Sequence, residues 1–185
     1  MHLFLRHVKN IHSVLFDKYL LLTNTFICGF GAGVSDITAQ KLENLIIEKQ
    51  FVGINWNRTM KFSGIALIMG PTVHFWYRWL DKIIPGNSLK IVCTKSLIDG
   101  FSFSPAYICA FYLIEKSFNK ADNKSGLLGL NINGFKYWVF ETALASPLQI
   151  FNFRFLPLKY RVVFDNFVSY WFDTVFAYFF NKEES

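Results

Sequence analysis

Hydrophobic and aromatic residues dominate most of the chain, and polar residues recur inside each hydrophobic stretch at helical spacing. Charges at the edges, and single acids inside, keep every charge-free window below the roughly 18 residues expected of a membrane span. Flanks rich in Trp and Tyr still favour spans, because both side chains suit membrane–water interfaces. The pattern predicts five helices, at residues 16–43, 58–82, 90–118, 134–153 and 158–180.

Turn-forming and polar residues separate the predicted helices. The tripeptide Pro-Gly-Asn at 85–87 is a clear turn signal. Residues 119–133 form the most polar stretch, and residues 44–57 form a mixed, mildly amphipathic connection. Pro157 marks a break between the last two helices. Because no linker divides the chain, we expect residues 16–185 to form a single multi-span membrane domain.

A polar stripe runs along each predicted helix. At 100° per residue, Glu141, Ala145, Gln149 and Asn152 fall within about 80° of one another on the fourth helix. The other stripes contain Thr25, Gly29, Asp36 and Gln40; Gly70, His74, Arg78 and Asp81; Lys95, Asp99, Ala106 and Ala110; and Arg161, Asp165 and Ser169. Two interpretations compete. Small and polar residues can simply pack helices together, or the stripes can line a hydrophilic conduit.

Charges inside the stripes favour the conduit, because a charge in a membrane is costly unless it is paired or wetted. Lys95 and Asp99 stand four residues apart, as do Arg161 and Asp165, so each pair could instead be neutralised locally without water. His74 has two interpretations as well. It can be a gate that titrates near neutral pH, or a hydrogen-bonded packing residue.

Composition supports a membrane protein. Of 185 residues, 52% are hydrophobic and 17% are charged, against about 25% charged in a soluble domain, and the mean hydropathy is +0.28. Trp76, Tyr77 and Trp79 are typical of an interface belt. The net charge of +6 comes from dispersed Lys and Arg. Dispersed charge favours contact with membrane lipid, or the setting of topology, over direct nucleic-acid binding.

No motif indicates catalysis, a cofactor or a metal. The chain lacks the zinc-protease, phosphate-loop and dinucleotide signatures, so we expect neither an enzyme nor a bound cofactor. Cys28, Cys93 and Cys109 have no paired spacing, and their apolar settings predict buried thiols rather than a disulfide framework or a zinc site. Residues 1–15 form a basic arm with no acid before Asp17, which resembles a mitochondrial targeting segment.

Four blocks of residues, spread over about residues 19–180, point to a known family. They contain Thr25, Asp36 and Gln40; Arg58, Gly64, Gly70, Pro71, His74, Trp76, Tyr77, Leu80, Asp81 and Pro85; Lys95, Asp99 and Pro105; and Pro147, Gln149, Asn152, Phe153, Pro157 and Arg161. On the long second and fourth blocks, the chain resembles the peroxisomal membrane protein two and Mpv-seventeen family of small multi-span organelle membrane proteins. His74 before Trp76, and Asp173 before Thr174, are most similar to its mitochondrial Mpv-seventeen-like two branch.

The resemblance implies an all-α integral membrane bundle of four to six helices, with the fourth helix as either a full or a partial span. It implies a non-enzymatic protein of the mitochondrial inner membrane, with the peroxisomal membrane as the alternative. The leading hypothesis is a small-solute channel or pore that supports organelle homeostasis. The alternatives are a peroxisomal channel and a membrane-bound factor for mitochondrial ribosome assembly and translation. That factor would dock to a ribosomal particle through the basic regions 41–61 and 116–136 and the N-terminal arm. The protein could also form a homo-oligomer.

The stripes and the family blocks together select the candidate residues. The candidate polar or pore-lining residues are Asp36, His74, Asp99, Gln149, Asn152 and Arg161. The structural residues implied by the family motif are Gly70, Pro71, Trp76, Tyr77, Pro147, Phe153 and Pro157. The acids and the arginine would set the electric field of a path, and the amides would offer hydrogen bonds to a solute. Two departures weaken the transfer of pore chemistry: Ser146 replaces the usual Trp, and Gly100 replaces the usual Gln.

Overall fold

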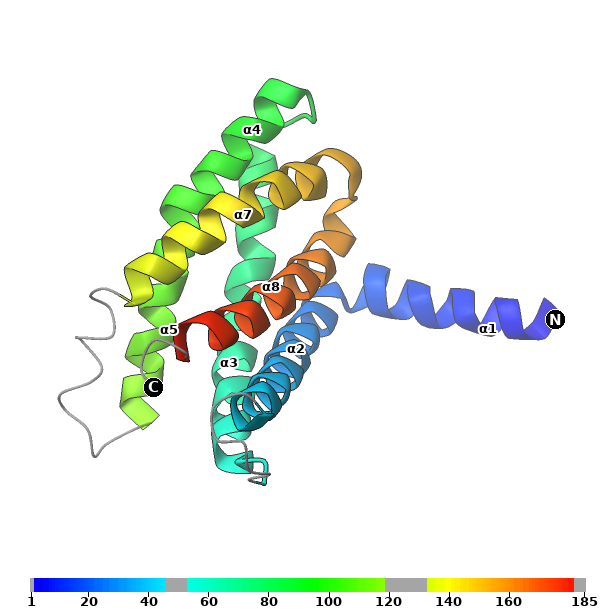
Figure 1. The fold of residues 1–185 in the computed structure, drawn as a ribbon. Helices are drawn as coiled ribbons and strands as arrows, with labels where there is room; N and C mark the ends of the chain where they lie inside the picture. Colours follow the sequence, from blue (N-terminus) through cyan, green and yellow to red (C-terminus); the bar gives the residue numbers. More distant parts are fainter. Residues whose placement is uncertain (1, 46–52, 119–132, 182–185) are drawn as a thin grey trace.

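The computed structural model describes residues 2–45, 53–118 and 133–181, and the described residues contain helices and no strand (Figure 1). Two short π-helical turns interrupt the α-helices. In chain order, the elements are α1 (His2–Ser13), the π-turn η1 (Val14–Lys18), α2 (Leu20–Glu43), α3 (Trp56–Ile83), α4 (Leu89–Ile98), the π-turn η3 (Asp99–Phe103), α5 (Ser104–Phe118), α7 (Asn133–Phe155) and α8 (Leu158–Asn181). The α4, η3 and α5 elements run on as one helical segment, Leu89–Phe118.

The five predicted helices are present, with ends that move by at most a few residues. The break at Pro157 is confirmed, because α7 ends at Phe155 and α8 begins at Leu158. The predicted turn at 85–87 is present too, and Gly86 supplies its left-handed backbone, with a φ of 108°. Residues 119–132 and 46–52, which hold most of the predicted loops, lie outside the described residues.

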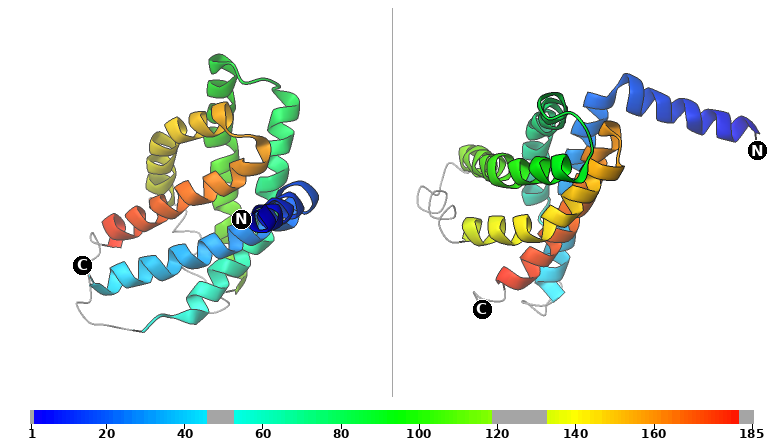
Figure 2. Two further views of the ribbon diagram at one scale, coloured as in Figure 1. Left: turned by 90° about the vertical axis from the view of Figure 1, so that its right-hand side faces the viewer. Right: turned by 90° about the horizontal axis from the view of Figure 1, so that it is seen from above.

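The N-terminal arm is the main addition to the predicted elements. It folds as the separate helix α1 and continues through η1 into α2. In Figure 2, α1 runs across the direction of α2 and away from the other helices. Within the bundle, α2 packs chiefly against α3 and α8, and α4 packs against α7. The remaining helices therefore form one bundle, to which α1 is attached at one end.

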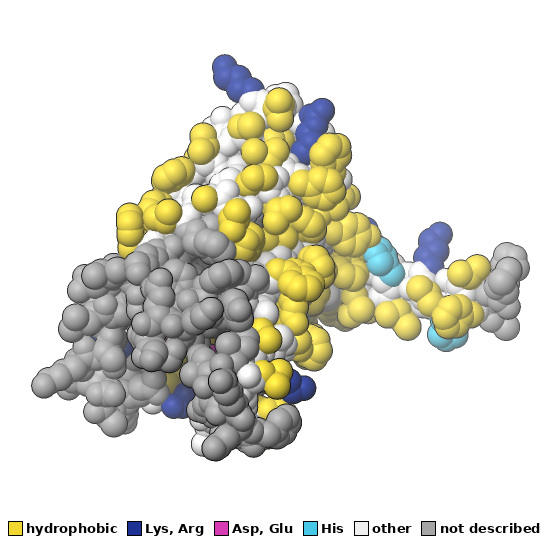
Figure 3. Space-filling model, in the orientation of Figure 1, with side chains coloured by type: hydrophobic (Ala, Val, Ile, Leu, Met, Phe, Trp, Pro, Cys, Tyr) yellow, Lys and Arg dark blue, Asp and Glu magenta, His cyan; other side chains and the backbone are white. Residues whose placement is uncertain are grey.

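The outer surface of the bundle is apolar. On α2, Leu22, Phe26 and Phe30 recur every fourth residue and are each about two-thirds exposed, while Asn24 and Asp36 are buried. Hydrophobic side chains also cover much of the described surface in Figure 3. Two described helical segments, Leu20–Glu43 and Leu89–Phe118, are long and apolar enough to cross a membrane. Only 33% and 6% of their most apolar windows are buried, whereas the core helix of a soluble protein would be mostly covered.

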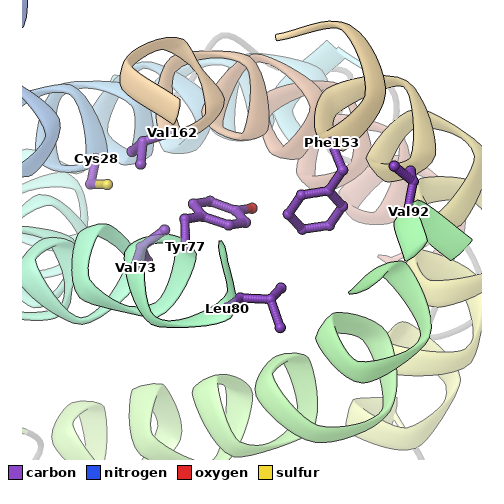
Figure 4. Close-up of a cluster of buried hydrophobic side chains, with 7 residues drawn as sticks. All are labelled: Cys28, Val73, Tyr77, Leu80, Val92, Phe153 and Val162. Carbon is purple, nitrogen blue, oxygen red and sulfur yellow. The ribbon is translucent and has the colours of Figure 1, made fainter. Parts of the chain in front are cut away.

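A small apolar cluster fills the junction of five helices, where α2, α3, α4, α7 and α8 meet (Figure 4). Its members are Cys28, Val73, Tyr77, Leu80, Val92, Phe153 and Val162. Tyr77 is 2% exposed, so its place in a predicted interface belt is wrong. The ring meets Phe153 edge to face, at 5.7 Å between centroids. Trp79 at 50% exposure remains at the surface.

The cysteines are only partly as predicted. All three are free thiols, but only Cys28 is buried, and Cys109 is exposed. Cys109 lies on the segment Leu89–Phe118, whose apolar surface is largely uncovered. In a soluble protein, a cysteine among apolar residues is usually buried. Where the outer surface of the bundle is itself apolar, such a cysteine can also be exposed.

Gly70 lets α2 and α3 approach closely. A Cβ atom at Gly70 would lie 2.8 Å from the backbone Cα of Thr25, which no side-chain rotation can relieve. We expect Gly70→Ala to destabilise the bundle by about 1–3 kcal/mol, the usual cost of overpacking. Thermal unfolding of the purified protein in detergent micelles measures the change.

Gly64 supplies the matched control for this prediction. It lies on the same helix, and a Cβ atom there would meet nothing within 4 Å. We expect Gly64→Ala to raise stability by about 0.5–1 kcal/mol, because alanine favours the helix. Equal effects of the two substitutions would show that helix propensity, and not the contact with Thr25, decides the result.

Candidate functional site

A cavity of about 540 Å³ lies inside the bundle, between α2, α3, the Leu89–Phe118 segment, α7 and α8. This volume is in the range of ligand pockets, about 300–1,000 Å³. Aromatic, aliphatic and small residues form much of its wall, among them Phe62, Phe103 and Tyr107, and carboxylates, amides and hydroxyls form its polar part. The polar stripes of different helices therefore do meet around a common space.

An ion-pair network lies where α2 ends and α3 begins. The Arg58 Nε atom is 2.7 Å from Asp36 Oδ1, and its Nη1 atom is 2.8 Å from Glu43 Oε2. The other Asp36 oxygen accepts hydrogen bonds from Gln40 Nε2 at 2.7 Å and from Thr59 Oγ1 at 2.6 Å. The Asp36 side chain is 4% exposed and that of Arg58 is 36% exposed. A buried carboxylate is thus satisfied by a cation that itself reaches the surface.

Two further carboxylates line the cavity nearer the apolar cluster. The indole Nε1 of Trp76 donates a hydrogen bond to Asp99 at 2.6 Å. Gln149 Nε2 donates to Asp165 Oδ1 at 2.6 Å and to the Tyr77 hydroxyl at 3.1 Å. Among the described side chains, neither Asp99 nor Asp165 has a Lys, Arg or His within ion-pair distance. Neutral donors therefore hold both acids at the wall.

Asp99 owes its position to the π-turn η3. A π-turn is one residue wider than an α-turn and changes which side chains face inward. In this turn the Ser104 amide bonds the Asp99 carbonyl, and Pro105 has no N–H to bond the Gly100 carbonyl. That carbonyl accepts a hydrogen bond from Trp138 Nε1 at 2.9 Å. A Cβ atom at Gly100 would lie 3.0 Å from Thr142 Cγ2. The position lines the cavity, so the glycine leaves space where the family usually has a glutamine.

The described wall of the cavity carries more acidic than basic side chains. Its described acidic side chains are Asp36, Glu43, Asp99, Glu115 and Asp165, and its described basic side chain is Arg58. A wall with this balance attracts cations and offers many acceptors to neutral polar solutes, and it disfavours anions. Among the described residues, no group of three His, Cys, Asp or Glu side chains could hold a metal ion.

Three of the six candidate polar residues line the cavity: Asp36, Asp99 and Gln149. His74 lies outside its lining, 4% exposed, with its Nδ1 atom 2.9 Å from Asn24 Nδ2. Its contacts match the packing interpretation better than the gating one. Asn152 is fully buried and its Nδ2 atom donates to Gln149 Oε1 at 3.1 Å. Asn152 therefore helps to position the side chain of Gln149, which lines the cavity.

Arg161 belongs to a different cluster, at the end of the bundle where α3 ends and α8 begins. Its Nη1 atom is 2.8 Å from Asp81 Oδ1, and the Nζ atom of Lys95 is 2.5 Å from the same oxygen. Lys95 also donates to the Gly86 carbonyl at 3.0 Å. The expected local pairs with Asp99 and Asp165 are therefore wrong. One aspartate from α3 pairs with cations from two other helices, and this leaves both cavity acids without these two partners.

The structural residues of the family blocks are found at helix contacts. Trp76 stacks on Phe103 at 4.6 Å between ring centroids and fixes Asp99, while Phe153 belongs to the apolar cluster. Pro71 and Pro147 lie inside α3 and α7. Sequence reasoning left Asp165 and Arg58 out of the candidate site. Asp165 was visible in the stripe of the last helix, and Arg58 in the second family block.

Comparison with known proteins agrees with the resemblance seen in the sequence. A model of the Mpv17 / PMP22 family matches residues 120–177. The mitochondrial inner membrane protein Mpv17 of Xenopus laevis is 31% identical over 81% of this chain and 84% of its own length. The PXMP2/4 family protein 2 of Dictyostelium discoideum is 28% identical over 89% of this chain and 86% of its own. The peroxisomal membrane protein 2 of Bos taurus is 24% identical over 85% and 82%.

The names of these relatives include both membranes that the sequence predicts, the mitochondrial inner membrane and the peroxisomal membrane. No solved structure matches the chain.

Proposed function

The chain belongs to the Mpv17 / PMP22 family, and from that premise we propose that it is a multi-span protein of the mitochondrial inner membrane whose cavity forms part of a path for small polar solutes. The single observation that carries the proposal is the cavity of about 540 Å³, with polar side chains from several helices on its wall. Polar groups inside an apolar-coated bundle are costly unless they are paired or meet water or a solute, and Asp99 and Asp165 have no described cation within ion-pair distance.

A bundle of four to six membrane-crossing helices fits the element lengths. The α2, α3, α7 and α8 helices have 24, 28, 23 and 24 residues, and the Leu89–Phe118 segment has 30. At about 1.5 Å per residue, each reaches across a hydrocarbon core of about 30 Å. The exposed phenylalanines of α2 then face lipid, and the carboxylates face the interior.

The wall of the cavity suggests which solutes pass. Gln149 and Tyr77 offer hydrogen bonds deep in the bundle, and Arg58 with its two carboxylates stands nearer the surface. Small neutral hydroxylated solutes and small cations suit this lining, since both use the many acceptors. Multivalent anions do not, because the described acids outnumber the one described cation of the wall.

Solute flux through the purified protein tests the proposal. Liposomes that contain the protein should release small polyols and small cations faster than protein-free liposomes, and should retain large dextrans. Release should fall with solute size because the path is narrow. Absence of flux for every size class, at any membrane potential and in either redox state, would overturn the proposed solute path.

The location has its own test. The proposed inner-membrane location rests on the name of the Xenopus laevis relative. A fluorescent protein fused to the C-terminus should colocalise with a mitochondrial inner-membrane marker. Colocalisation with a peroxisomal marker would instead assign the chain to the membrane named for the Bos taurus relative.

A further inference from the structure

The α1 arm presents an apolar face that nothing in the described structure covers. Phe4, Val8 and Ile11 follow the i, i+4, i+7 spacing that places side chains on one side of a helix. Their exposed fractions are 72%, 47% and 56%. Arg6 and Lys9 lie on the opposite side. Figure 3 shows hydrophobic side chains along the lower edge of this arm and a basic one at its upper edge.

The orientation of the arm is fixed by contacts at its bundle end. The His12 Nε2 atom is 2.6 Å from the Tyr160 hydroxyl, and the His12 ring stacks on Phe16. Lys159 Nζ donates to Asp17 Oδ1 at 2.9 Å, and this hydrogen bond lowers the pKa of Asp17. These contacts join the start of α8 to η1, so α1 is held across α2 as Figure 2 shows.

The orientation matters because α2 is a candidate membrane span. A helix that lies across a span, at its end, runs along the plane of the membrane surface. There its apolar side chains can enter the acyl region while its basic side chains stay among the headgroups, as in other interfacial helices. The exposed apolar face and the transverse orientation of α1 are both explained by this placement.

The same end of the bundle is basic. Besides Arg6 and Lys9 of α1 and Lys18 of η1, it carries Lys82, Lys90 and Arg154 in the terminal helical turns of α3, α4 and α7. Its described acids, Asp17 and Asp81, are both held in ion pairs. The remaining cations have no acid to neutralise them at this end. Such a surface is complementary to anionic phospholipid headgroups.

We propose that α1 is an interfacial anchor that binds the headgroup region of an anionic leaflet, together with the basic turns of the same end. The proposal rests on the proposed membrane location and not on the solute path. A failed flux experiment therefore leaves it standing. It also assigns this end of the bundle, where the described Lys and Arg outnumber the described acids, to the leaflet side with more anionic lipid.

Fluorescent probes on two sides of α1 test the anchor in the full-length protein. In a background with Cys93→Ser and Cys109→Ser, an environment-sensitive NBD probe is attached through Val8→Cys or Asn10→Cys, which lie on opposite sides of the helix. The protein is placed in nanodiscs of phosphatidylcholine, alone or mixed with phosphatidylglycerol. In the mixed nanodiscs, we expect the probe at position 8 to be blue-shifted and protected from an aqueous quencher, and the probe at position 10 to stay accessible.

Charge variants test the role of the anionic headgroups. The double variant Arg6→Gln, Lys9→Gln should bind the membrane surface less well. The ratio of membrane-bound to free α1 should fall by roughly fivefold per charge removed, the effect of one basic residue near an anionic surface. Lys41→Gln and Lys116→Gln, at the opposite end of the bundle, remove the same charge and should leave the ratio unchanged. Added salt should lower the ratio of the parent protein, because salt screens the surface charge.

Three results would overturn the proposal. In mixed nanodiscs, equal quencher access at positions 8 and 10 would mean that α1 does not enter the interface. Equal protection in both lipid mixtures, unchanged by the Arg6 and Lys9 variants, would exclude recognition of anionic lipid. Protection at position 8 in detergent, together with disulfide-linked dimers of the Val8→Cys protein, would assign the apolar face to a second copy of the chain.

Discussion

The Asp81→Asn variant should lose about 3–5 kcal/mol of stability, the cost of breaking a buried ion pair by removing one partner. Its carboxylate oxygen is the only described anion within ion-pair distance of Lys95 or Arg161. Those two side chains are 1% and 8% exposed, so neither cation can turn to water once the charge is gone. Heat or denaturant unfolding in detergent micelles, compared with the parent protein, measures the loss.

Asp17→Asn is the matched control for this prediction. Asp17 also pairs with a lysine, but the side chains of Asp17 and Lys159 are 54% and 32% exposed. We expect little change in stability, because water replaces most of what an exposed pair provides. If the Asp17 and Asp81 variants unfold alike, the buried cations do not depend on Asp81 and the three-helix ion cluster is not a stabilising element.

A double variant separates the loss of the pair from other effects of the substitution. Asp81→Asn combined with Lys95→Met removes one of the two stranded cations. It should therefore be more stable than the sum of the two single changes predicts. Additive losses would mean that Lys95 and Asp81 act independently, despite the 2.5 Å between their charged atoms.

Ala145→Trp should abolish solute flux while the protein stays folded. Ala145 lies on α7 and lines the cavity beside Gln149, so an indole there occupies the space that a solute would cross. Trp has a large side chain, and replacing the methyl group of Ala145 by an indole narrows the cavity of about 540 Å³. We expect release from liposomes to fall to the level of protein-free liposomes.

Leu144→Trp provides the control on the same helix. Leu144 precedes Ala145 and is 49% exposed on the outer side, where an added Trp meets lipid instead of the cavity. Flux through this variant should match that of the parent protein. Circular dichroism and elution volume in detergent establish that both variants fold. Normal flux through folded Ala145→Trp protein would place the solute path outside the cavity.

Local sequence signals were enough to place the bundle helices. Pro157 and the turn at 85–87 mark ends that depend only on neighbouring residues. The α1 helix was missed because its apolar residues are interspersed with Arg6, Lys9 and three histidines. A search for charge-free windows passes over such a segment. The amphipathic spacing of Phe4, Val8 and Ile11 was present in the sequence all the same.

The candidate site was predictable only in part, because its charges are paired between helices. Helical spacing placed Asp99 on an inward stripe, and the structure places it on the cavity wall. The same spacing paired it with Lys95, since residues four apart are neighbours on one helix. The actual partner of Lys95 is Asp81, on another helix. Which helices contact each other, and which of their residues lie side by side, depends on the packing of the whole bundle.

The prediction that Tyr77 lies at the membrane interface was wrong for a related reason. Trp76, Tyr77 and Trp79 are neighbours in sequence, but successive residues on a helix point in different directions. Trp79 points outward at 50% exposure, whereas Tyr77 points into the apolar cluster (Figure 4). An aromatic run therefore indicates an interface only after each residue has been assigned to a side of the helix.

The three-helix ion cluster also implies an order of assembly. A chain made from its N-terminus forms α3 and α4 before α8, and Asp81 and Lys95 belong to these two neighbouring helices. The hairpin can therefore enter the bilayer with its opposite charges already matched. Arg161 arrives on α8, after the other bundle helices, and binds the aspartate that Lys95 already occupies. Helix α8 thus adds its own cation to a pair that α3 and α4 already form, and a chain that stops before residue 158 would lack this contact.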